Sequence, residues 1–441
     1  MFRFAFAMFC AASVSTAAIA APCAGFTDVD DSNAFCVNVE WMKNRGITLG
    51  LTPTLFGPDA AVTRLQMAAF MYRLGFQNAL LRGGNSFGAP AILGTTDGHV
   101  VEVIASNARV MRYEPNGISP NVIGGSYANF VDAGIRGATI AGGGTPPGSE
   151  PFHDGEAPNR VAFDYGTVAG GYGNVAGSGS SAPFFASVGG GRFNIAAASS
   201  STVAGGESNQ AIGFGAAVAG GTGNLANGQS SAILGGYSNA ASGTGSVVAG
   251  GGNNTAAGAY SFAAGLAAKA NWNGCFVFAD YSNPFATSCF ANNEIVMRGL
   301  GGFYFWTSGS SDNTYTGASL APGSGAWAAY SDRDGKQAIN AVDPTSVLEK
   351  LVAMPIATWQ WKAEPGNVLH MGPTAQDFRA AFGLGNSNKK IVTVDADGVA
   401  LAAIQGLNAK LESVRAEKDA EIVALRAGLA EVRAVLDAMR R

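Results

Sequence analysis

Ser331 and Lys336 lie five residues apart in the charged stretch SDRDGK, which follows a long segment with few charges. A serine hydroxyl becomes a nucleophile when a base removes its proton, and a lysine amine can be that base where burial lowers its pKa. Such a Ser-Lys pair can cut a peptide bond. Because the spacing alone has no specificity, the assignment depends on the segments that surround the pair.

Two carboxylates could do a different chemistry in the middle of the chain. Asp164 and Glu207 are the only acidic residues between positions 160 and 270, and glycoside hydrolysis needs a pair of carboxylates at a defined separation. The repeat described below places these acids several turns apart, although acids of different chains in a trimer could still meet. The sequence therefore gives little support to the cleavage of a polysaccharide.

The histidines do not indicate a metal site. His153, Asp154 and Glu156 form a dense polar cluster, but TPPGSEPFHDGEAPNR has the composition of an inserted surface loop. His99 lies in a turn-like sequence, TTDGHVVEV, and the chain has only 3 histidines. We therefore expect neither a metal nor another cofactor.

The composition differs from that of an ordinary globular chain. Charged residues make up 13% of the sequence and glycine occupies 62 of its 441 positions, whereas globular proteins have roughly 25% charged residues and about 7% glycine. Much of the chain is therefore expected to be repetitive. Lys and Arg number 27 against 31 acids and form no basic patch, which argues against binding to nucleic acid.

The N-terminal residues predict export. Residues 1–20 begin with Arg3, continue through an apolar run, and end in AIA at 18–20, the small-x-small pattern that signal peptidase cuts. The mature chain is expected to begin at Ala21, and no other run is apolar enough to predict a membrane span. The protein is therefore expected to be extracellular or held at the cell surface.

Removal of the signal peptide leaves an even number of cysteines in an oxidising compartment. Cys10 is lost, and Cys23, Cys36, Cys275 and Cys289 remain. Proximity in the sequence favours a disulfide between Cys23 and Cys36. It favours Cys275 with Cys289 for the same reason, although four cysteines allow three connectivities.

Residues 21–80 predict a small helical module. A first helix ends at Gly46 and carries apolar residues at helical spacing, namely Phe35, Val39 and Met42. After a loop, Thr63 and Gln66 form a capping box. The second helix that follows has its apolar positions at Met67, Phe70, Met71 and Leu74.

This module resembles a single S-layer homology domain. The resemblance rests on FTDV at 26–29, GITLG at 46–50, FGP at 56–58 and VTRLQ at 62–66. Domains of this family hold proteins to cell-wall polysaccharide or peptidoglycan, so the resemblance implies that Asp28 and Arg64 lie near a glycan site. A solvated Arg64 on the first turn of its helix is the alternative.

A fixed repeat organises residues 121–270. The pattern Val/Ile-x-Gly-Gly-x-x-Asn recurs every fifteen residues from Asn194 to Asn254, and an earlier copy ends at Asn174. A buried β-branched residue, a glycine pair and an Asn that can adopt a left-handed turn predict a β-solenoid, whose turns must stack to be stable. The inward residues are then Val168, Val188, Val203, Val218, Ile233 and Val248.

These repeats resemble the left-handed β-roll heads of trimeric autotransporter adhesins. The resemblance implies a mainly β protein, a left-handed parallel β-roll or solenoid fibre made by three identical chains. Residues 81–120 would form a connecting β segment, and residues 271–329, with alternating apolar residues, a transition or neck. A flexible glycine-rich segment is the alternative, which the apolar period disfavours.

Residues 330–411 resemble the intramolecular chaperone of phage endosialidases and tail fibres, a self-cleaving serine peptidase family. SDRDGK, VDPTSVLEKL, PIATWQW, HMGPTAQDF and VDADGVALAAIQGL occur in the order of that family. The resemblance implies an α+β domain in which Ser331 is the nucleophile and Lys336 the base. The bond between Tyr330 and Ser331 would be cut in a single turnover. His370 and Gln376 are expected to pack the domain core or a trimer contact.

Residues 404–441 predict a coiled coil between three chains. Apolar residues recur at steps of three and four, with a stutter at Lys418. A helix packed on its own domain is the alternative. The apolar positions are Ile404, Leu407, Leu411, Val414, Ile422, Leu425, Leu429, Val432, Leu436 and Met439.

Together these segments predict an exported homotrimeric surface fibre or adhesin. A wall-binding domain would carry a β-solenoid shaft, and a C-terminal chaperone would align three chains and then release itself. The first alternative is a purely structural adhesin whose C-terminal domain stays attached. The second is a polysaccharide-degrading fibre of the tailspike kind. The expected partners are cell-wall glycan and, for an adhesin, a surface receptor.

Overall fold

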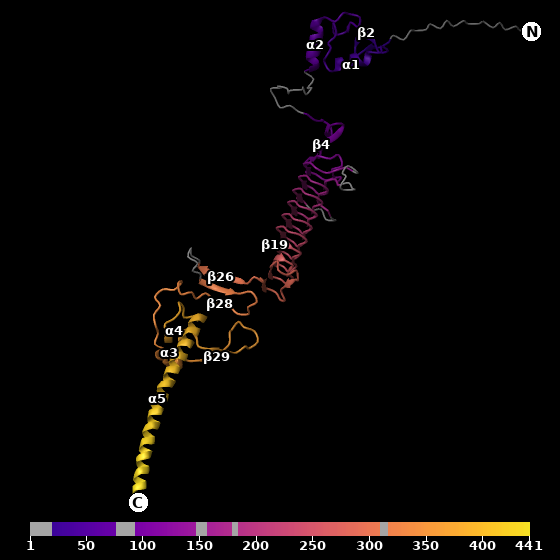
Figure 1. Cartoon of the computed structure of the whole chain (residues 1–441). Coiled ribbons are helices and arrows are strands. Elements are labelled where there is room, and N and C mark those ends of the chain that lie inside the picture. The colour runs from indigo at the N-terminus through magenta and orange to yellow at the C-terminus, as the bar shows by residue number, and fades with distance from the viewer. Residues whose placement is uncertain (1–19, 76–92, 147–156, 179–183, 309–315) are drawn as a thin grey trace, which may run out of the picture. The chain divides into compact units, whose positions relative to one another are not determined.

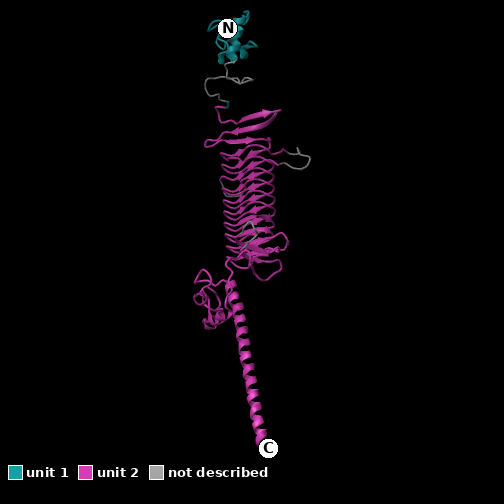
Figure 2. Ribbon diagram, turned by 60° about the vertical axis from the view of Figure 1, so that its left-hand side comes forward, with its two compact units in different colours: residues 1–94 teal, residues 95–441 magenta. Residues whose placement is uncertain are grey.

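The computed structural model describes residues 20–75, 93–146, 157–178, 184–308 and 316–441. They belong to two compact units, 1–94 and 95–441, which are described separately (Figure 1, Figure 2). The expected signal peptide, apart from Ala20, lies outside the described residues, and so do His153, Asp154 and Glu156. Within the described ranges, no helix combines the length and the apolar character needed to cross a membrane.

The first unit contains a small antiparallel sheet and two helices, β1 (Pro22–Cys23), β2 (Phe26–Asp30), α1 (Cys36–Asn44) and α2 (Arg64–Gly75). Its core consists of Cys23, Phe26, Val29 and Val39, and a disulfide joins Cys23 to Cys36. The covalent link stabilises a module that is too small to bury a large apolar core.

The expected capping box is present at the start of α2. The backbone N–H of Thr63 donates to Oε1 of Gln66 over 2.8 Å, and the N–H of Gln66 donates to Oγ1 of Thr63 over 3.2 Å. Each side chain thus pairs a backbone N–H that the first turn of a helix leaves without a partner. The box fixes where α2 begins.

The apolar faces of the two helices differ from those expected. On α1 only Val39 is buried, and Phe35 precedes the helix with 70% of its surface exposed. On α2, Met67, Met71 and Leu74 are exposed. Helical spacing identifies residues that share a face, but it does not determine whether the same chain covers that face.

The predicted β-solenoid is confirmed. Successive turns add a strand alternately to two sheets with parallel pairing, so strands fifteen residues apart pair in register in the regular repeats. Residues 101–114 extend one of these sheets at its N-terminal end by antiparallel pairing. Val203 pairs with Val218 in one sheet, and Ala211 pairs with Ala226 in the other. The repeat of the sequence is therefore one turn of the structure.

The described residues form a 13-stranded and a 10-stranded sheet. The strands of the 13-stranded sheet are β3 (Val101–Ala105), β4 (Ala108–Glu114), β5 (Asn121–Gly124), β7 (Thr139–Ile140), β9 (Thr167–Val168), β11 (Ser187–Val188), β13 (Thr202–Val203), β15 (Ala217–Val218), β17 (Ala232–Ile233), β19 (Val247–Gly252), β21 (Phe262–Leu266), β23 (Phe276–Ala279) and β25 (Ile295–Arg298). Those of the 10-stranded sheet are β6 (Phe130–Val131), β8 (Arg160–Val161), β10 (Val175–Ala176), β12 (Ile195–Ala196), β14 (Gln210–Ala211), β16 (Leu225–Ala226), β18 (Ala240–Ala241), β20 (Thr255–Ala256), β22 (Ala268–Ala270) and β24 (Thr287–Ser288).

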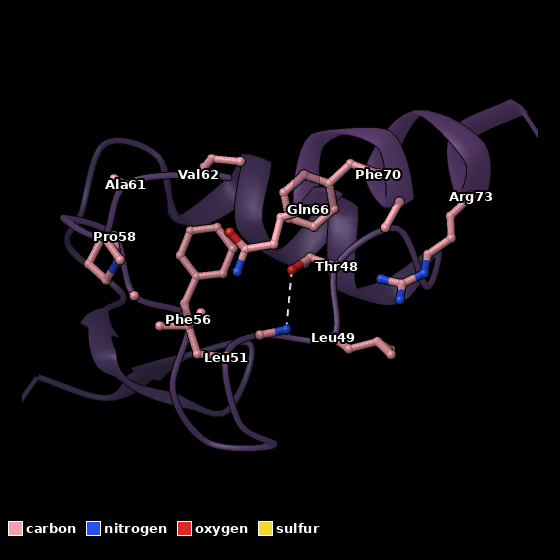
Figure 3. A pocket seen from close by; sticks show the side chains of 14 residues that line it. Thr48, Leu49, Leu51, Phe56, Pro58, Ala61, Val62, Gln66, Phe70 and Arg73 are labelled. Carbon is pink, nitrogen blue, oxygen red and sulfur yellow. Dashed lines mark hydrogen bonds between the residues drawn. The ribbon is translucent and has the colours of Figure 1, made fainter. Parts of the chain in front are cut away.

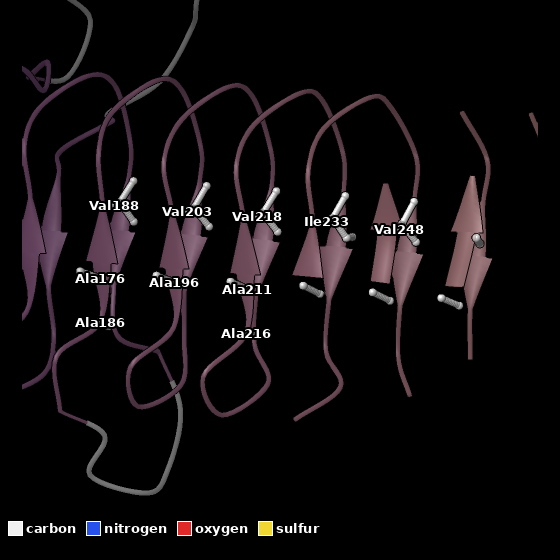
Figure 4. Packing of buried hydrophobic residues seen from close by; sticks show 14 of the residues in the cluster. Ala176, Ala186, Val188, Ala196, Val203, Ala211, Ala216, Val218, Ile233 and Val248 are labelled. Atoms are coloured by element: carbon white, nitrogen blue, oxygen red, sulfur yellow. The ribbon is translucent and has the colours of Figure 1, made fainter. Parts of the chain in front are cut away.

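The core between the sheets is thin. Figure 4 shows a row of β-branched residues, among them Val203 and Val218, facing a row of alanines that includes Ala196 and Ala211. These side chains are 0–1% exposed. Because one turn contributes a single branched side chain and a few small ones to the core, each turn is stable only with its neighbours stacked on both sides.

The repeated Asn is not the left-handed turn residue that the pattern suggested. The positive φ falls on the residue before it, such as Ser208 with a φ of 55°, and Asn209 itself is buried. The Nδ2 group of Asn209 donates to the carbonyl oxygens of Gly205 (3.0 Å) and Gly221 (2.8 Å). Its N–H donates to Oδ1 of Asn194. The Asn side chain therefore pairs the backbone N–H of the next buried Asn and a glycine carbonyl oxygen of its own turn, and it adds a second donor to the Gly221 carbonyl oxygen, which also accepts the N–H of Glu207 (2.9 Å).

The second glycine of each pair has a steric role. Gly206 has a φ of 91°, and a Cβ there would lie 2.2 Å from the carbonyl oxygen of Gly221 in the next turn. Stacked backbones therefore approach too closely at this corner for any side chain. The glycine pair and the Asn belong to the same corner and are needed together.

The solenoid extends beyond the expected boundary at residue 270. The Gly-Gly-x-x-Asn pattern ends at Asn254, yet β21, β23 and β25 continue the parallel pairing to Arg298. A disulfide joins Cys275 to Cys289, and Arg298 donates to Oδ1 of Asp280 over 3.0 Å. The last turns have irregular lengths and are held by these links instead of the Asn corner, so the sequence period could not identify them.

The C-terminal part begins with an antiparallel sheet, the neck sheet, of β26 (Phe303–Ser308), β27 (Thr316–Leu320) and β28 (Ala328–Ala329). It continues through α3 (Pro344–Ala353), β29 (Ala357–Trp359), β30 (His370–Gly372), α4 (Ala375–Phe382) and α5 (Thr393–Met439). Met354, Phe378 and Val399 form a small core between the helices.

The expected chaperone helix and the expected coiled-coil segment are one continuous helix, α5, of 47 residues. Its N-terminal part packs on α3, where a Cβ at Gly406 would lie 2.2 Å from the carbonyl oxygen of Pro344. This glycine lets the two helices cross closely. Beyond Gly406, the residues of α5 are exposed in the single chain.

Candidate functional site

Ser331 and Lys336 meet in the loop that follows the neck sheet. The Nζ atom of Lys336 lies 2.5 Å from Oγ of Ser331. The loop turns back on itself because the N–H of Asp334 donates to Oδ1 of Asp332 (3.0 Å) and the N–H of Lys336 donates to the carbonyl oxygen of Arg333 (3.1 Å). Two residues that are apart in the sequence are thereby brought into hydrogen-bonding contact.

The surroundings of the pair are open. Ser331 and Lys336 are both exposed to solvent in the single chain. A serine-lysine pair works as nucleophile and base when the amine is neutral, and water around an amine favours its charged form. The geometry of the single chain thus supplies contact between the two groups but not the enclosure that the chemistry needs.

The residue before the pair belongs to the neck sheet. Tyr330 follows β28 directly, and its N–H donates to the carbonyl oxygen of Gly317 over 3.1 Å. The peptide bond between Tyr330 and Ser331 therefore lies where an ordered strand passes into the loop of the pair. The sequence predicts cleavage of this bond but did not predict the strand that precedes it.

His370 and Gln376 lie in the chaperone-like segment that follows. His370 is on β30, its Nε2 lies 2.7 Å from Oε2 of Glu364, and its ring stacks on Trp359 with 4.8 Å between ring centroids. Gln376 lies on α4. His370 is thus held within the β29–β30 hairpin by an acid and an aromatic ring, consistent with packing rather than catalysis.

Asp164 and Glu207, the two acids between positions 160 and 270, are each paired with an arginine. Oδ2 of Asp164 accepts from Nε of Arg136 at 2.8 Å, and Glu207 forms an ion pair with Arg192 of the preceding turn. Carboxylates engaged in such rung-to-rung pairs act as links between turns. This arrangement gives no support to glycoside hydrolysis, which needs two carboxylates facing one substrate.

In the N-terminal unit, Asp28 has a clear local role. Its two carboxylate oxygens accept the backbone N–H groups of Phe56 (2.8 Å) and Gly57 (2.7 Å). The hydrogen bond from Phe56, together with that from Gly57, lowers the pKa of Asp28 because both stabilise the charged carboxylate. Asp28 therefore fixes the Phe-Gly-Pro loop rather than pointing a free carboxylate at a ligand.

A hollow of about 280 Å³ lies between that loop and α2. Figure 3 shows Gln66, Phe70 and Arg73 reaching from α2 toward Thr48 and Phe56. The guanidinium of Arg73 also donates to the carbonyl oxygen of Ile47 over 3.3 Å. The hollow thus combines aromatic rings with a cation and an amide, groups that suit a sugar bearing polar or anionic substituents.

Arg64, which the sequence favoured as a glycan contact, is the first residue of α2 and is exposed; it does not line the hollow. At 100° per residue, Arg73 lies about 180° around the helix from Arg64 and about 20° from Gln66. The i, i+7 relation between Gln66 and Arg73 could have identified them from the sequence as sharing one face.

Two family models match this chain. The model described as S-layer homology domain matches residues 25–68, a span that includes Asp28, Arg64 and Gln66. The model described as chaperone of endosialidase matches residues 331–383 and begins at Ser331. No curated protein matches the chain. The chain thus carries an S-layer homology domain near its N-terminus and an endosialidase chaperone domain beyond residue 330, with a β-solenoid between them.

Proposed function

We propose that the protein is an exported trimeric surface fibre that processes itself. The S-layer homology domain attaches the fibre to cell-wall polysaccharide, the β-solenoid forms its shaft, and the chaperone domain aligns three chains before it is cut off between Tyr330 and Ser331. The observation that carries the proposal is the contact between Lys336 Nζ and Ser331 Oγ, at 2.5 Å, at the first residue of the chaperone match.

The outer face of the 13-stranded sheet supports association of chains. This face consists of the residues that flank the column of inward-pointing residues running from Ile140 on β7 to Val296 on β25, one from each strand, and none of these flanking residues is charged. Interfaces between proteins are depleted of charge at their centre, and large exposed apolar faces mark such interfaces. The outward residues are Thr139, Ala141, Thr167, Ala169, Ser187, Gly189, Thr202, Ala204, Ala217, Ala219, Ala232, Leu234, Val247, Ala249, Phe262, Ala264, Phe276, Phe278, Ile295 and Met297.

The other sheet differs. Along the corresponding outer positions of the 10-stranded sheet, Arg160 and Lys269 interrupt the row. Arg160 is paired with Asp132, and that hydrogen bond raises the pKa of the guanidinium further above its ordinary value. The two sheets therefore differ in charge only near β8 and β22, because the outer positions of β10 to β20 between them carry no charge either.

The exposed apolar row on α5 supports a coiled coil. Leu407, Leu411, Leu425 and Leu429 are each more than half exposed in the single chain. A leucine row of this length on an isolated helix would leave a large apolar surface in water, whereas two or three such helices bury it together. Assembly along α5 would align the three chains that the solenoid face brings together.

Assembly would also provide what the Ser331–Lys336 pair lacks. In the proposed reaction, neutral Lys336 takes the proton of the Ser331 hydroxyl while Oγ attacks the carbonyl carbon of Tyr330. The C–N bond of the peptide then breaks, and the nitrogen takes the proton from Lys336 to become the free amine of Ser331. Water, deprotonated by Lys336, attacks the resulting ester, Lys336 returns that proton to the departing Oγ of Ser331, and Tyr330 is left as a carboxylate. Neighbouring chains in the trimer would enclose the pair and exclude bulk water from it.

The exposure of both groups in the single chain also favours the second candidate, a structural adhesin that stays intact. The test compares purified wild type with Ser331→Ala and Lys336→Ala on a denaturing gel, with light scattering to measure the mass of each assembly. We expect two fragments for wild type and one intact chain for each variant, all trimeric. Arg333→Ala, in the same loop, is the matched control and should be cut. An intact wild type in a correct trimer would leave the structural adhesin as the function.

A further inference from the structure

Three residues lie in one row across the neck sheet. Trp306 on β26 pairs with Gly317 on β27. Ala318 pairs with Ala329 on β28, so the next position of the same register places Tyr330 beside Gly317. The hydrogen bond from the Tyr330 N–H to the Gly317 carbonyl oxygen, at 3.1 Å, extends the pairing by that one residue.

Trp306 and Tyr330, on the two outer strands, are in contact across Gly317 on the middle strand. Nε1 of Trp306 donates to the hydroxyl oxygen of Tyr330 over 3.3 Å. Residues directly opposite one another on neighbouring strands point to the same face of a sheet. Gly317 has no side chain, so the indole and the phenol can meet across the strand that separates them.

The middle position admits only glycine. Gly317 has a φ of 151°, and a Cβ there would lie 1.9 Å from the carbonyl oxygen of Phe305. The backbones of β26 and β27 therefore approach closely at the point where the two aromatic side chains bridge. The glycine and the Trp306–Tyr330 contact are parts of one arrangement.

This row ends at the bond that the proposed cleavage would break. Tyr330 supplies the carbonyl carbon that Ser331 would attack, and its side chain and N–H are both tied to the neck sheet. We infer that Trp306 is a positioning residue for the cleavage, which holds Tyr330 in the strand while the Ser331–Lys336 loop turns against it. The inference rests on the proposed self-cleavage. It adds that Trp306 holds in place the bond to be cut, between Tyr330 and Ser331.

The physical reason is the fixed geometry of the reacting atoms. An intramolecular attack is fast when the nucleophile and the carbonyl carbon are held near their reactive separation, and freedom in either partner lowers the rate. The loop fixes Ser331 through its contact with Lys336. The hydrogen bond from Trp306 adds a side-chain contact to the backbone hydrogen bond that ties Tyr330 to β27, just beyond a two-residue strand.

Trp306→Phe and Tyr330→Phe each remove one partner of the hydrogen bond and keep an aromatic ring. The experiment follows the rate at which full-length trimer is converted to fragments for wild type, both variants and the double variant. We expect each single variant to be cut about fivefold more slowly, the size of one ordinary hydrogen bond. The double variant should be no slower than either single one, because the same bond is lost once.

Tyr304→Phe is the matched control, since it removes a hydroxyl from the same strand and is expected to be cut at the wild-type rate. Thermal unfolding of the trimers separates positioning from general stability, because the cleavage rate should fall while the midpoint stays unchanged. Equal cleavage rates for wild type and Trp306→Phe would overturn the inference and leave the proposed cleavage standing. The same would follow if the double variant were slowed by the product of the two single effects. An intact wild type would overturn the proposed cleavage and the inference with it.

Discussion

The side-chain oxygen of Asn209 accepts the backbone N–H of Asn224 at 3.1 Å, one turn further along the solenoid. Asn224 repeats this contact with Asn239, also at 3.1 Å. The buried asparagines thus form a ladder that runs parallel to the column of valines. The ladder joins neighbouring turns by polar contacts, while the thin core joins them by apolar ones.

Asn224→Ala should destabilise the solenoid strongly for its size. It removes the side-chain partner of the Gly220 carbonyl oxygen and of the N–H of Asn239, a buried residue, and a buried group left unpaired costs about 1–3 kcal/mol. The Gly236 carbonyl oxygen keeps the N–H of Thr222 as a donor. Thermal unfolding followed by circular dichroism measures the loss. Asn227→Ala removes an exposed Asn from the same turn and should change stability by no more than about 0.5 kcal/mol. Equal effects of the two changes would contradict the role of the ladder.

Val218→Asp and Ala219→Asp place the same charge one residue apart on opposite faces of one strand. Val218 is 1% exposed, so an unpaired carboxylate there should cost several kcal/mol and prevent folding of the solenoid. Ala219 is exposed on the outer face, so Ala219→Asp should fold as a single chain but fail to assemble.

Circular dichroism and light scattering distinguish these outcomes. Val218→Asp should lose its β signal, while Ala219→Asp should keep it and scatter as a monomer. A trimeric Ala219→Asp variant would show that the outer face of the 13-stranded sheet is not where the chains meet.

Acid should loosen the Phe-Gly-Pro loop of the S-layer homology domain. Hydrogen bonds from Phe56 and Gly57 lower the pKa of Asp28 in the folded state. The stabilisation is therefore fully present above the unfolded-state pKa of about 3.9, and it is lost as the pH falls through the lower folded-state pKa.

Hydrogen exchange at the amides of Phe56 and Gly57 measures this effect. Both amides should exchange faster in Asp28→Asn than in wild type at neutral pH, and the difference between the two proteins should shrink below about pH 4. A difference that stayed constant down to pH 2 would mean that the carboxylate charge does not hold the loop.

Binding to isolated cell wall should depend on Arg73. Arg73 lines the hollow with Gln66, whereas Arg64 is exposed outside it. Arg73→Ala should weaken sedimentation of the full-length trimer with wall fragments by about tenfold or more, the usual scale for a charged hydrogen bond lost from a binding site. Arg64→Ala should have the smaller effect. The reverse order would place the glycan contact at the helix start, as the family resemblance implied.

The fold could be predicted from the sequence where the repeat is regular. The valine period identifies the inward column from Val168 to Val248, because a short parallel turn must bury the same position each time. The role of the Asn could not be predicted, since turn propensity and a buried hydrogen-bonding ladder favour the same residue type. The last turns could not be predicted, because they lack the Gly-Gly-x-x-Asn pattern. The disulfide between Cys275 and Cys289 and the hydrogen bonds of Arg298 hold them together instead.

The candidate site was predictable in part for a similar reason. The Ser331–Lys336 contact follows from local spacing within one loop. The contact between Trp306 and Tyr330 depends on the register of a three-stranded sheet, which joins residues 24 positions apart. In the S-layer homology domain, the family resemblance implied that Arg64 lies near the glycan site. The arginine that lines the hollow is Arg73, which lies beyond residue 68, where the family match ends.

The central claim is that the assembled fibre cuts itself between Tyr330 and Ser331. The most direct test is the intact mass of each polypeptide in purified wild-type trimer, measured by mass spectrometry under denaturing conditions beside Ser331→Ala. The account predicts one chain that ends at Tyr330 and a second that spans 331–441, with a free amine on Ser331. A wild-type trimer that contains only the uncut chain, or a fragment that begins at another residue, would contradict it.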